Sequence, residues 1–426
     1  MTRDPLRLLV CNDVETAVDD PKRIGRLAGA IEALRDDRTA VLDAGDATAM
    51  GALAFATDTG RGQIGPFHRA ISPDAHVPGN HDFDYGQDWL AGFSAAVPGP
   101  WLGANVDGGV HLDLRDSVVL EVDRRRVGVV GVANPETPEL CAAIEDLSFS
   151  DPVTAAERAI DDLPVVDHVV VLSHCGELDS EIAQSVDADA VVGAHDHERV
   201  VERVAGTLVA RTAGVGHELL EVELGDGQPA ATIHETADFP VDETIADTYR
   251  ERFDAAGLDD HLATLDGPLT TLETAQFVAD TYRTEAATPT GDGGADAGFV
   301  LEASVREPLS GEVTTGDIVG TVPFDSKLET VEMDAEEFRS ALRATVDPID
   351  GTHGRGIWAN ADPEAMTLGG EPVPENGTVT VGTTSYEAQK GILPGFSAEA
   401  IVADAGPQYE RLLAHARNGG LDAMGE

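Results

Sequence analysis

Five short polar clusters in the first half of the chain follow directly on apolar runs, and each contains side chains that bind metal ions. They are Asn12-Asp13-Val14-Glu15, Asp43-Ala44-Gly45-Asp46, Gly79-Asn80-His81-Asp82, Ser173-His174 and Gly193-Ala194-His195-Asp196-His197. Carboxylates, imidazoles and amide oxygens are ligands of divalent cations. The residue types therefore indicate a site for divalent metal ions.

The clusters differ in how specific they are. Asp13-x-Glu15 alone is typical of a solvated loop in a chain with 78 acidic residues, and His174 alone is typical of a hydrogen-bonded core histidine. Gly79-Asn80-His81-Asp82 is more specific, because the glycine supplies a tight turn. Gly193-x-His195-x-His197 is also more specific, because alternate residues of an extended segment point the same way. The prediction of a metal site rests on all five clusters occurring together in this order.

The elements that must position these clusters alternate between short β-branched runs and amphipathic stretches. Helical spacing predicts helices over Ile24–Arg35, Val153–Leu163 and Leu178–Val186. Strands are predicted at Leu6–Val10, Ala40–Ala44, Ala75–Val77, Val127–Val132, Val165–Leu172, Ala188–Val192 and Thr207–Ala210. Ligands in open α/β sheets gather outside the carboxyl ends of the strands, so the clusters are expected to converge on one pocket.

The alternation stops near Pro240, among acidic residues. We therefore expect a catalytic domain over residues 1–237, a linker helix over 238–260 and a second domain over 261–426.

The composition describes the solvent more than the activity. The 426 residues include 28 basic and 78 acidic side chains, a formal charge of −50, with 42% hydrophobic residues. Such an excess of acid excludes a protein that coats nucleic acid, and it argues against binding to anionic membranes. In molar salt the Debye length falls to about 3 Å, which screens the self-repulsion. The chain is therefore expected to be halophilic.

The sequence also indicates a compartment. No stretch reaches the roughly 18 apolar residues of a membrane span, and Leu8-Leu9-Val10 is too short for the core of a signal peptide. Cys11, Cys141 and Cys175 are few, odd in number and widely spaced, as expected for buried thiols in a reducing interior. We expect a cytoplasmic location. The sequence does not predict an oligomeric state.

The order of the clusters resembles the metallophosphoesterase (calcineurin-like) superfamily, with its D-x-H, G-D, G-N-H-[DE], H and G-H-x-H motifs. The stretch from Gly79 to Asp84 is similar to the G-N-H-E-F-D of the 5′-nucleotidase branch. The resemblance covers residues 5–215 well. It implies an α/β fold, namely a four-layer αββα sandwich with two metals at its rim, followed by a smaller α+β C-terminal domain.

The resemblance also implies a role for each residue. Asp46 would bridge both metals. Asp13, Glu15 and His197 would complete one site, and Asn80, His174 and His195 would complete the other. His81 would face the phosphate as a catalytic residue, with Asp84 orienting its imidazole.

The first motif departs from the family, because Glu15 stands where a histidine is usual. Glutamate adds a negative charge and a hard oxygen, which favours Mn²⁺, or Fe²⁺, over Zn²⁺. The expected cofactors are two divalent ions, with Mn²⁺ first and Fe²⁺, Zn²⁺ or Co²⁺ as alternatives. A helix cap or solvated loop is the alternative role of Glu15.

The second half resembles the 5′-nucleotidase C-terminal domain more weakly. In the family's A-D-x-A-x-x-N-x-G-G-x-R motif, Arg306 matches the arginine. Leu301, Ala303 and Ser304 replace the Asn and the two Gly. Phe324 and Tyr386 fall at the positions of the two base-stacking aromatics, although the G-G-D-G-Y motif after the second is absent. The resemblance implies that Arg306, Phe324 and Tyr386 bind substrate. The alternative is that both rings are core aromatics.

The leading hypothesis is a dinuclear-metal phosphoric ester hydrolase of the 5′-nucleotidase type, active in nucleotide catabolism. It would hydrolyse a phosphate ester of a small nucleotide-like substrate through a metal-bridging hydroxide. One alternative is a phosphatase or cyclic phosphodiesterase acting on a sugar phosphate or cyclic nucleotide. The other is a nucleotide sensor without turnover.

Overall fold

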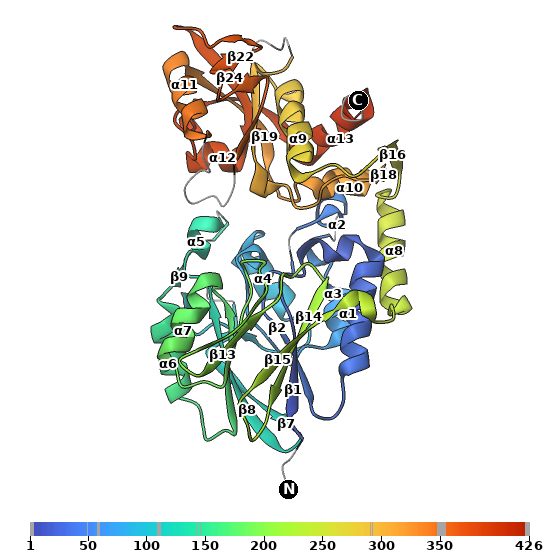
Figure 1. Cartoon of the computed structure of the whole chain (residues 1–426), viewed down its shortest axis with the longest axis vertical. Coiled ribbons are helices and arrows are strands. Elements are labelled where there is room, and N and C mark those ends of the chain that lie inside the picture. The colour runs from blue at the N-terminus through green and yellow to red at the C-terminus, as the bar shows by residue number, and fades with distance from the viewer. Residues whose placement is uncertain are drawn as a thin grey trace. The chain divides into compact units, whose positions relative to one another are not determined.

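The computed structural model describes residues 4–48, 50–57, 60–108, 112–141, 143–144, 146–289, 291, 293–346 and 355–421 (Figure 1). The chain divides into two compact units, Met1–Arg252 and Phe253–Glu426. Helix α8 (Glu243–Ala256) runs across the division. It lies within the segment predicted as a linker helix.

The first unit is built on two large sheets. The seven-stranded sheet has the order β15-β14-β1-β2-β3-β4-β6. Neighbouring strands from β1 to β6 run parallel, and β14 is antiparallel to β1. The bounds are β1 Leu6–Cys11, β2 Thr39–Asp43, β3 Ala75–His76, β4 Trp101–Leu102, β6 Leu114–Arg115, β14 Glu218–Leu224 and β15 Ala230–Glu235.

The six-stranded sheet has the order β12-β13-β11-β10-β8-β7. Its four inner strands are parallel and its two edge strands are antiparallel. The bounds are β7 Ser117–Val122, β8 Arg125–Ala133, β10 His168–His174, β11 Ala190–Val192, β12 Val200–Val204 and β13 Thr207–Arg211.

Successive side chains of each strand point to opposite faces of its sheet, so each sheet packs against the other sheet on one face and against helices on the other. In β8, Val127 and Val129 point into the core between the sheets, whereas Val130 and Val132 pack under α6 (Pro152–Asp161) and α7 (Asp179–Ser185). Helices α1 (Pro21–Leu34) and α3 (Gly65–Ile71) lie on the opposite side of the sandwich (Figure 1). The predicted four-layer αββα fold is confirmed.

Helix α1 begins at Pro21, three residues before the predicted start at Ile24. The side chain of Asp20 caps it by accepting the backbone N–H groups of Lys22 and Arg23, and Pro21 occupies the first turn. The remaining elements of this unit are shorter. They are helices α2 Ala52–Ala56, α4 Gln87–Ser94 and α5 Thr137–Leu140, strands β5 Val106–Gly108 and β9 Leu147–Phe149, and 3₁₀ turns η1 Glu15–Asp19, η2 Gly60–Gly62, η3 His81–Phe83, η4 Gly176–Leu178 and η5 Thr236–Asp238.

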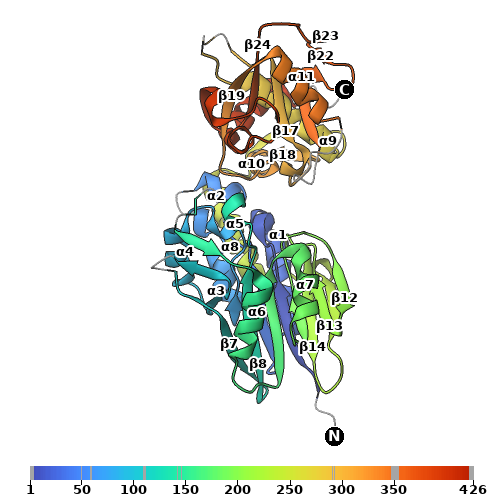
Figure 2. The same ribbon diagram turned by 90° about the vertical axis from the view of Figure 1, so that its left-hand side faces the viewer.

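The second unit has a five-stranded sheet with helices on both faces (Figure 2). Its order is β20-β17-β24-β19-β25, with bounds β17 Ala297–Leu301, β19 Lys327–Asp334, β20 Gly356–Ala359, β24 Thr378–Thr384 and β25 Ile401–Pro407. Val300 faces the core under α9 (Thr271–Glu285) and α13 (Gln408–His415), whereas Phe299 faces the core under α11 (Ala335–Ala344). This is the predicted α+β C-terminal domain.

Smaller elements complete the second unit. They are helices α10 Thr315–Thr321 and α12 Ser385–Lys390, strands β16 His261–Thr264, β18 Glu312–Thr314, β21 Ala361–Asp362, β22 Thr367–Leu368 and β23 Glu371–Pro372, and short turns η6 Glu302–Ser304, η7 Ala398–Ala400 and η8 Ala416–Gly420. Across the described parts of both units, no helix combines the length and the apolar character that crossing a bilayer requires.

Candidate metal centre

The polar clusters converge because they follow parallel strands of two sheets that face each other. Asp13, Asp46 and Asn80 come shortly after β1, β2 and β3, while His174 ends β10 and His195 follows β11. Their ligand atoms form overlapping groups in which each atom lies within 4.8 Å of the others. The groups are Asp46-His174-His195, Asp13-Glu15-His197 and Glu15-Asp46-His81.

Asp46 is at the centre of this arrangement and is 2% exposed. Its Oδ1 accepts the backbone N–H of His81 at 2.8 Å, and its Oδ2 lies 3.0 Å from His174 Nε2. Burial opposes ionisation of Asp46, but His174 and His81 outweigh it and hold the carboxyl pKa below its usual range. One oxygen of the carboxylate thus lies toward His81 and the other toward His174.

His174 is oriented by the backbone. Its Nδ1–H donates to the carbonyl of Ala44 at 2.7 Å, so Nε2 faces the carboxylates of Asp46 and Asp13, the latter at 3.9 Å. Burial lowers the pKa of His174, but Asp46 and Asp13 outweigh it and raise the pKa to about 10. In the metal-free chain a proton thus occupies the place between imidazole and carboxylate that a divalent cation fills in a metal site.

His195 has the opposite environment. Burial and the neighbouring His174 lower its pKa to about 4, so the ring is neutral and carries a lone pair. Its Nε2 lies 3.0 Å from the side-chain amide of Asn134. A neutral imidazole suits the role of a metal ligand, and a metal ion at Nε2 would replace the Asn134 contact.

Glu15 lies inside the cluster, not in a solvated loop. It is 1% exposed, and its Oε1 lies 3.1 Å from His197 Nε2. Asp13 is fully buried beside it and accepts the backbone N–H of His195. The side of the cluster formed by Asp13, Glu15 and His197 is therefore rich in hard carboxylate oxygens.

Backbone strain is concentrated at these residues. Asp13, Glu15, Asp46, His195 and His197 all have positive φ, at 45°, 43°, 52°, 87° and 50°. Such conformations cost on the order of 1–3 kcal/mol each and cluster at functional sites. Cross-loop hydrogen bonds hold them in place, since the N–H of Asp13 donates to Gly45 and that of Glu15 donates to Asp46.

Asn80 shows that the cluster fits a metal. Its Oδ1 is buried without a hydrogen-bond partner among the described residues, as a ligand atom is before its ion binds. Beside it, a Cβ on Gly79 would stand 2.1 Å from Asp46 Oδ1, so only glycine allows this close approach.

His81 and Asp84 form a pair at the rim. His81 Nδ1 donates to Asp84 Oδ2 at 2.9 Å, and the side chains are 18% and 28% exposed. Burial lowers the pKa of His81, but Asp84 and Asp46 outweigh it and raise the pKa to about 9. In the metal-free chain the imidazole is thus a cation at neutral pH.

Sequence reasoning missed two residues that hold the cluster together. Asp82 accepts the backbone N–H groups of Asp46, Ala47, Thr48 and Gly79, so it ties the β2 loop to the β3 loop. Buried Arg211 donates to Gly176 O and pairs with Asp196 at 2.9 Å. It thus joins the loop after His174 to the loop that carries His195 and His197. Asp82 could have been found from its place in the motif from Gly79 to Asp84, whereas no sequence pattern points to Arg211.

The predicted substrate residues all lie in the second unit, at one end of its sheet. Strands β19 and β24 pair Leu328 with Thr384, which places Phe324 and Tyr386 near the same end of these two strands. The guanidinium of Arg306 lies 5.5 Å from the centre of the Phe324 ring. Phe324 packs partly into the core, whereas Tyr386 is 43% exposed and is not a core aromatic.

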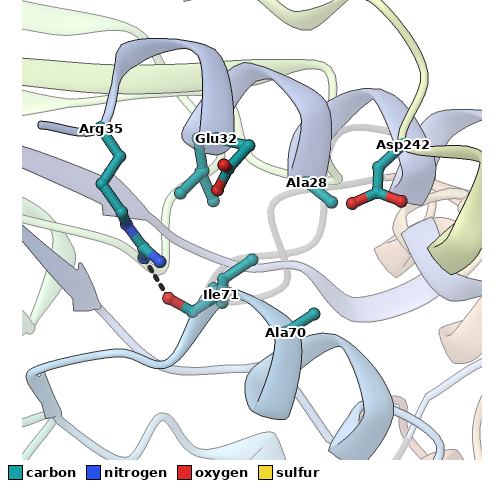
Figure 3. A pocket seen from close by; sticks show the side chains of 7 residues that line it. Ala28, Glu32, Arg35, Ala70, Ile71 and Asp242 are labelled. Atoms are coloured by element: carbon teal, nitrogen blue, oxygen red, sulfur yellow. Dashed lines mark hydrogen bonds between the residues drawn. The ribbon is translucent and has the colours of Figure 1, made fainter.

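A separate hollow in the first unit lies between α1 and α3 (Figure 3). Arg35 crosses it and donates to the carbonyl of Ile71. Its lining contains none of the candidate ligands; it consists of Ala28, Ile31, Glu32, Arg35, Ala70, Ile71 and Asp242.

Comparisons with known proteins agree with the geometry. The calcineurin-like phosphoesterase family model matches residues 6–199, and the 5′-nucleotidase, C-terminal domain model matches residues 261–397. A 5′-nucleotidase of Diplobatis ommata is 32% identical over 217 residues, 45% of this chain and 37% of that protein. The trifunctional nucleotide phosphoesterase YfkN of Bacillus subtilis is 23% identical over 412 residues, 81% of this chain and 28% of that protein. The matched segments thus span about a third of these relatives.

Solved structures agree on the fold. A 5′-nucleotidase precursor from Thermus thermophilus superposes with a TM-score of 0.79 at 19% identity, covering 97% of this chain and 96% of that one. The motifs, the sandwich and the two matched family models lead to one assignment. This chain belongs to the calcineurin-like metallophosphoesterases, in the 5′-nucleotidase family, with a divergent 5′-nucleotidase C-terminal domain.

Proposed function

We propose that the protein is a phosphoric ester hydrolase of the 5′-nucleotidase type that works with two divalent metal ions. The observation that carries the proposal is the sharing of Asp46. Its carboxylate belongs both to the group with His174 and His195 and to the group with Glu15 and His81. A shared carboxylate offsets the repulsion between two neighbouring cations.

The proposed ligands divide between two positions. Asp46 would contribute to both. The remaining ligands would be Asp13, Glu15 and His197 at one position and Asn80, His174 and His195 at the other. When bound, such ions attract the phosphate group and activate water.

The chain's own residues would do the rest of the chemistry. His81, a cation paired with Asp84, would donate to a phosphate oxygen and stabilise the charge that develops there. His174, held by Ala44 O, would keep a fixed ring orientation throughout.

Manganese is the proposed native ion, because Glu15 makes one side of the cluster rich in carboxylate oxygen. Fe²⁺, Co²⁺ and Zn²⁺ are the alternatives. The 78 acidic residues against 28 basic ones support a salt-rich cytoplasm as the working environment.

The proposed substrate is nucleotide-like, as the names of the relatives suggest. Arg306, Phe324 and the exposed ring of Tyr386 would bind it. A second candidate is a phosphatase or cyclic phosphodiesterase for another metabolite. It is favoured by Leu301, Ala303 and Ser304, which stand where the family has Asn and two Gly.

The test is a substrate panel assayed with Mn²⁺ in molar KCl. Nucleoside monophosphates, cyclic nucleotides and sugar phosphates would be compared for phosphate release or ring opening. If nucleoside monophosphates are hydrolysed fastest, the result supports the 5′-nucleotidase type of activity. Preference for another class supports the second, and no turnover of any substrate contradicts both.

A further inference from the structure

A second cluster of metal-capable side chains lies in the first unit, outside the candidate metal centre. Asp43 ends β2, His76 ends β3 and His68 comes from α3. All three side chains are 0% exposed, and their ligand atoms lie within 4.8 Å of one another. No role proposed above uses any of them.

The protonation of His76 leaves a place for a cation. Its Nε2–H donates to the carbonyl of Pro98 at 2.8 Å, so Nδ1 is the nitrogen that can offer a lone pair to a cation. That lone pair faces Asp43 Oδ2 at 2.9 Å. Two electron-rich atoms at this distance require a cation between them, either a proton or a metal ion. His174 and Asp46 have the same arrangement in the candidate metal centre, with the carbonyl of Ala44 in place of Pro98.

His68 favours the metal ion over the proton. Its Nε2 lies 3.1 Å from the same Asp43 oxygen. Neither ring nitrogen of His68 makes an aligned hydrogen bond to any described residue, although the side chain is fully buried. A proton between Asp43 and His76 leaves this imidazole unsatisfied. A metal ion at the same point would accept its lone pair as a third ligand.

The surroundings close the three side chains off from solvent. The His76 ring stacks on Trp101 at 4.8 Å between centroids, and His68 packs against Phe67 and Phe93. The carbonyl that holds His76 is a typical outer partner of a metal-binding histidine. Two imidazoles and one carboxylate form a ligand set for Zn²⁺, with a small ligand in the fourth position.

We propose that Asp43, His68 and His76 bind a third divalent cation, of the borderline class that Zn²⁺ represents, and that this ion has a structural role. It would join the ends of β2 and β3 to α3. Asp46 and Asn80 follow these two strand ends by a few residues, so the ion would brace the loops that carry them. The inference does not depend on the proposed reaction.

The test removes the candidate metal centre from the full chain and counts what is left. An Asp46→Asn, His174→Ala, His197→Ala variant is stripped with chelator, reloaded with Zn²⁺ alone, desalted and analysed for metal. About one ion per chain is expected. No bound zinc in the folded variant overturns the proposal and leaves a proton between Asp43 and His76.

Two further variants locate the ion. Adding Asp43→Asn, which preserves the volume of the side chain, should reduce the count to about zero. His168→Ala is the matched control, because it removes a histidine of the same unit that pairs with Asp189. The control should retain its ion, and an equal loss there contradicts the assignment.

A spectroscopic measurement covers the case in which Asp43→Asn does not fold. X-ray absorption at the zinc edge of the triple variant should show two imidazole ligands and one or more oxygens. A spectrum with fewer than two imidazoles overturns the proposal.

Discussion

The carboxylate of Asp82 accepts the backbone N–H of Asp46 at 3.0 Å. The same carboxylate accepts the N–H of Gly79 at 2.9 Å, so one buried side chain holds both the central aspartate and the loop of Asn80 and His81. The geometry of the candidate metal centre therefore depends on a residue that is not itself a proposed ligand.

Asp82→Asn should weaken the affinity for Mn²⁺ by about 10–100-fold, the usual effect of losing an outer partner of a metal site. The amide replaces an acceptor oxygen with an N–H₂ group that faces backbone donors. Titration calorimetry measures the affinity. Asp88→Asn, an exposed site with the same change of charge, is the control. Equal affinity in both variants contradicts the role of Asp82.

Asp84→Asn should move the basic limb of the kcat/KM–pH profile to lower pH, by about 1–3 units. Asp84 helps to raise the pKa of His81 to about 9. The imidazolium is present below that pKa and is lost as the pH rises through it. Without Asp84 the loss comes at lower pH. An exposed control, Asp107→Asn, should leave the profile in place, and an unshifted limb in Asp84→Asn rules out this pairing as the cause.

Glu15→His should raise the preference for Zn²⁺ over Mn²⁺ by at least about tenfold, because an imidazole replaces a hard anionic oxygen. Competition titrations with the two ions measure the ratio. Glu15→Gln separates the effect of charge from that of ligand type, since it should lower the affinity for both ions without favouring zinc. A ratio that is the same in the wild type and Glu15→His indicates that Glu15 does not bind metal.

Potassium chloride should raise the midpoint of thermal unfolding on the order of 10 °C between 0.1 and 2 M, which is about 3–4 kcal/mol for domains of this size. The cause is screening of a formal charge of −50. Sucrose at equal osmolality is the comparison, because it leaves charge repulsion unscreened. If sucrose stabilises the chain as much as the salt does, repulsion between acidic side chains is not the cause.

The convergence of the polar clusters was predictable because the carboxyl ends of parallel strands share an edge. Strands β14 and β15 were not predicted, since Glu218, Glu221 and Glu223 interrupt the apolar pattern of β14. Strand β10 begins at His168, later than the predicted Val165, which is 88% exposed.

Other features of the site depend on tertiary contacts that no local pattern encodes. The left-handed backbone of Asp13 and Glu15 is imposed by the neighbouring β2 loop, which accepts their N–H groups. Likewise, Asp43 and His68 meet only because α3 packs beside β2, and their spacing along the chain carries no metal-binding motif.

The most direct measurement of the central claim is an anomalous-scattering map at the manganese edge from crystals of the Mn²⁺-loaded chain. Two peaks about 3.5–4 Å apart are expected, each within bonding distance of one oxygen of Asp46. The peak nearer Glu15 should also touch Asp13 and His197, and the other should touch Asn80, His174 and His195. A single peak, or manganese bound away from Asp46, would contradict the account.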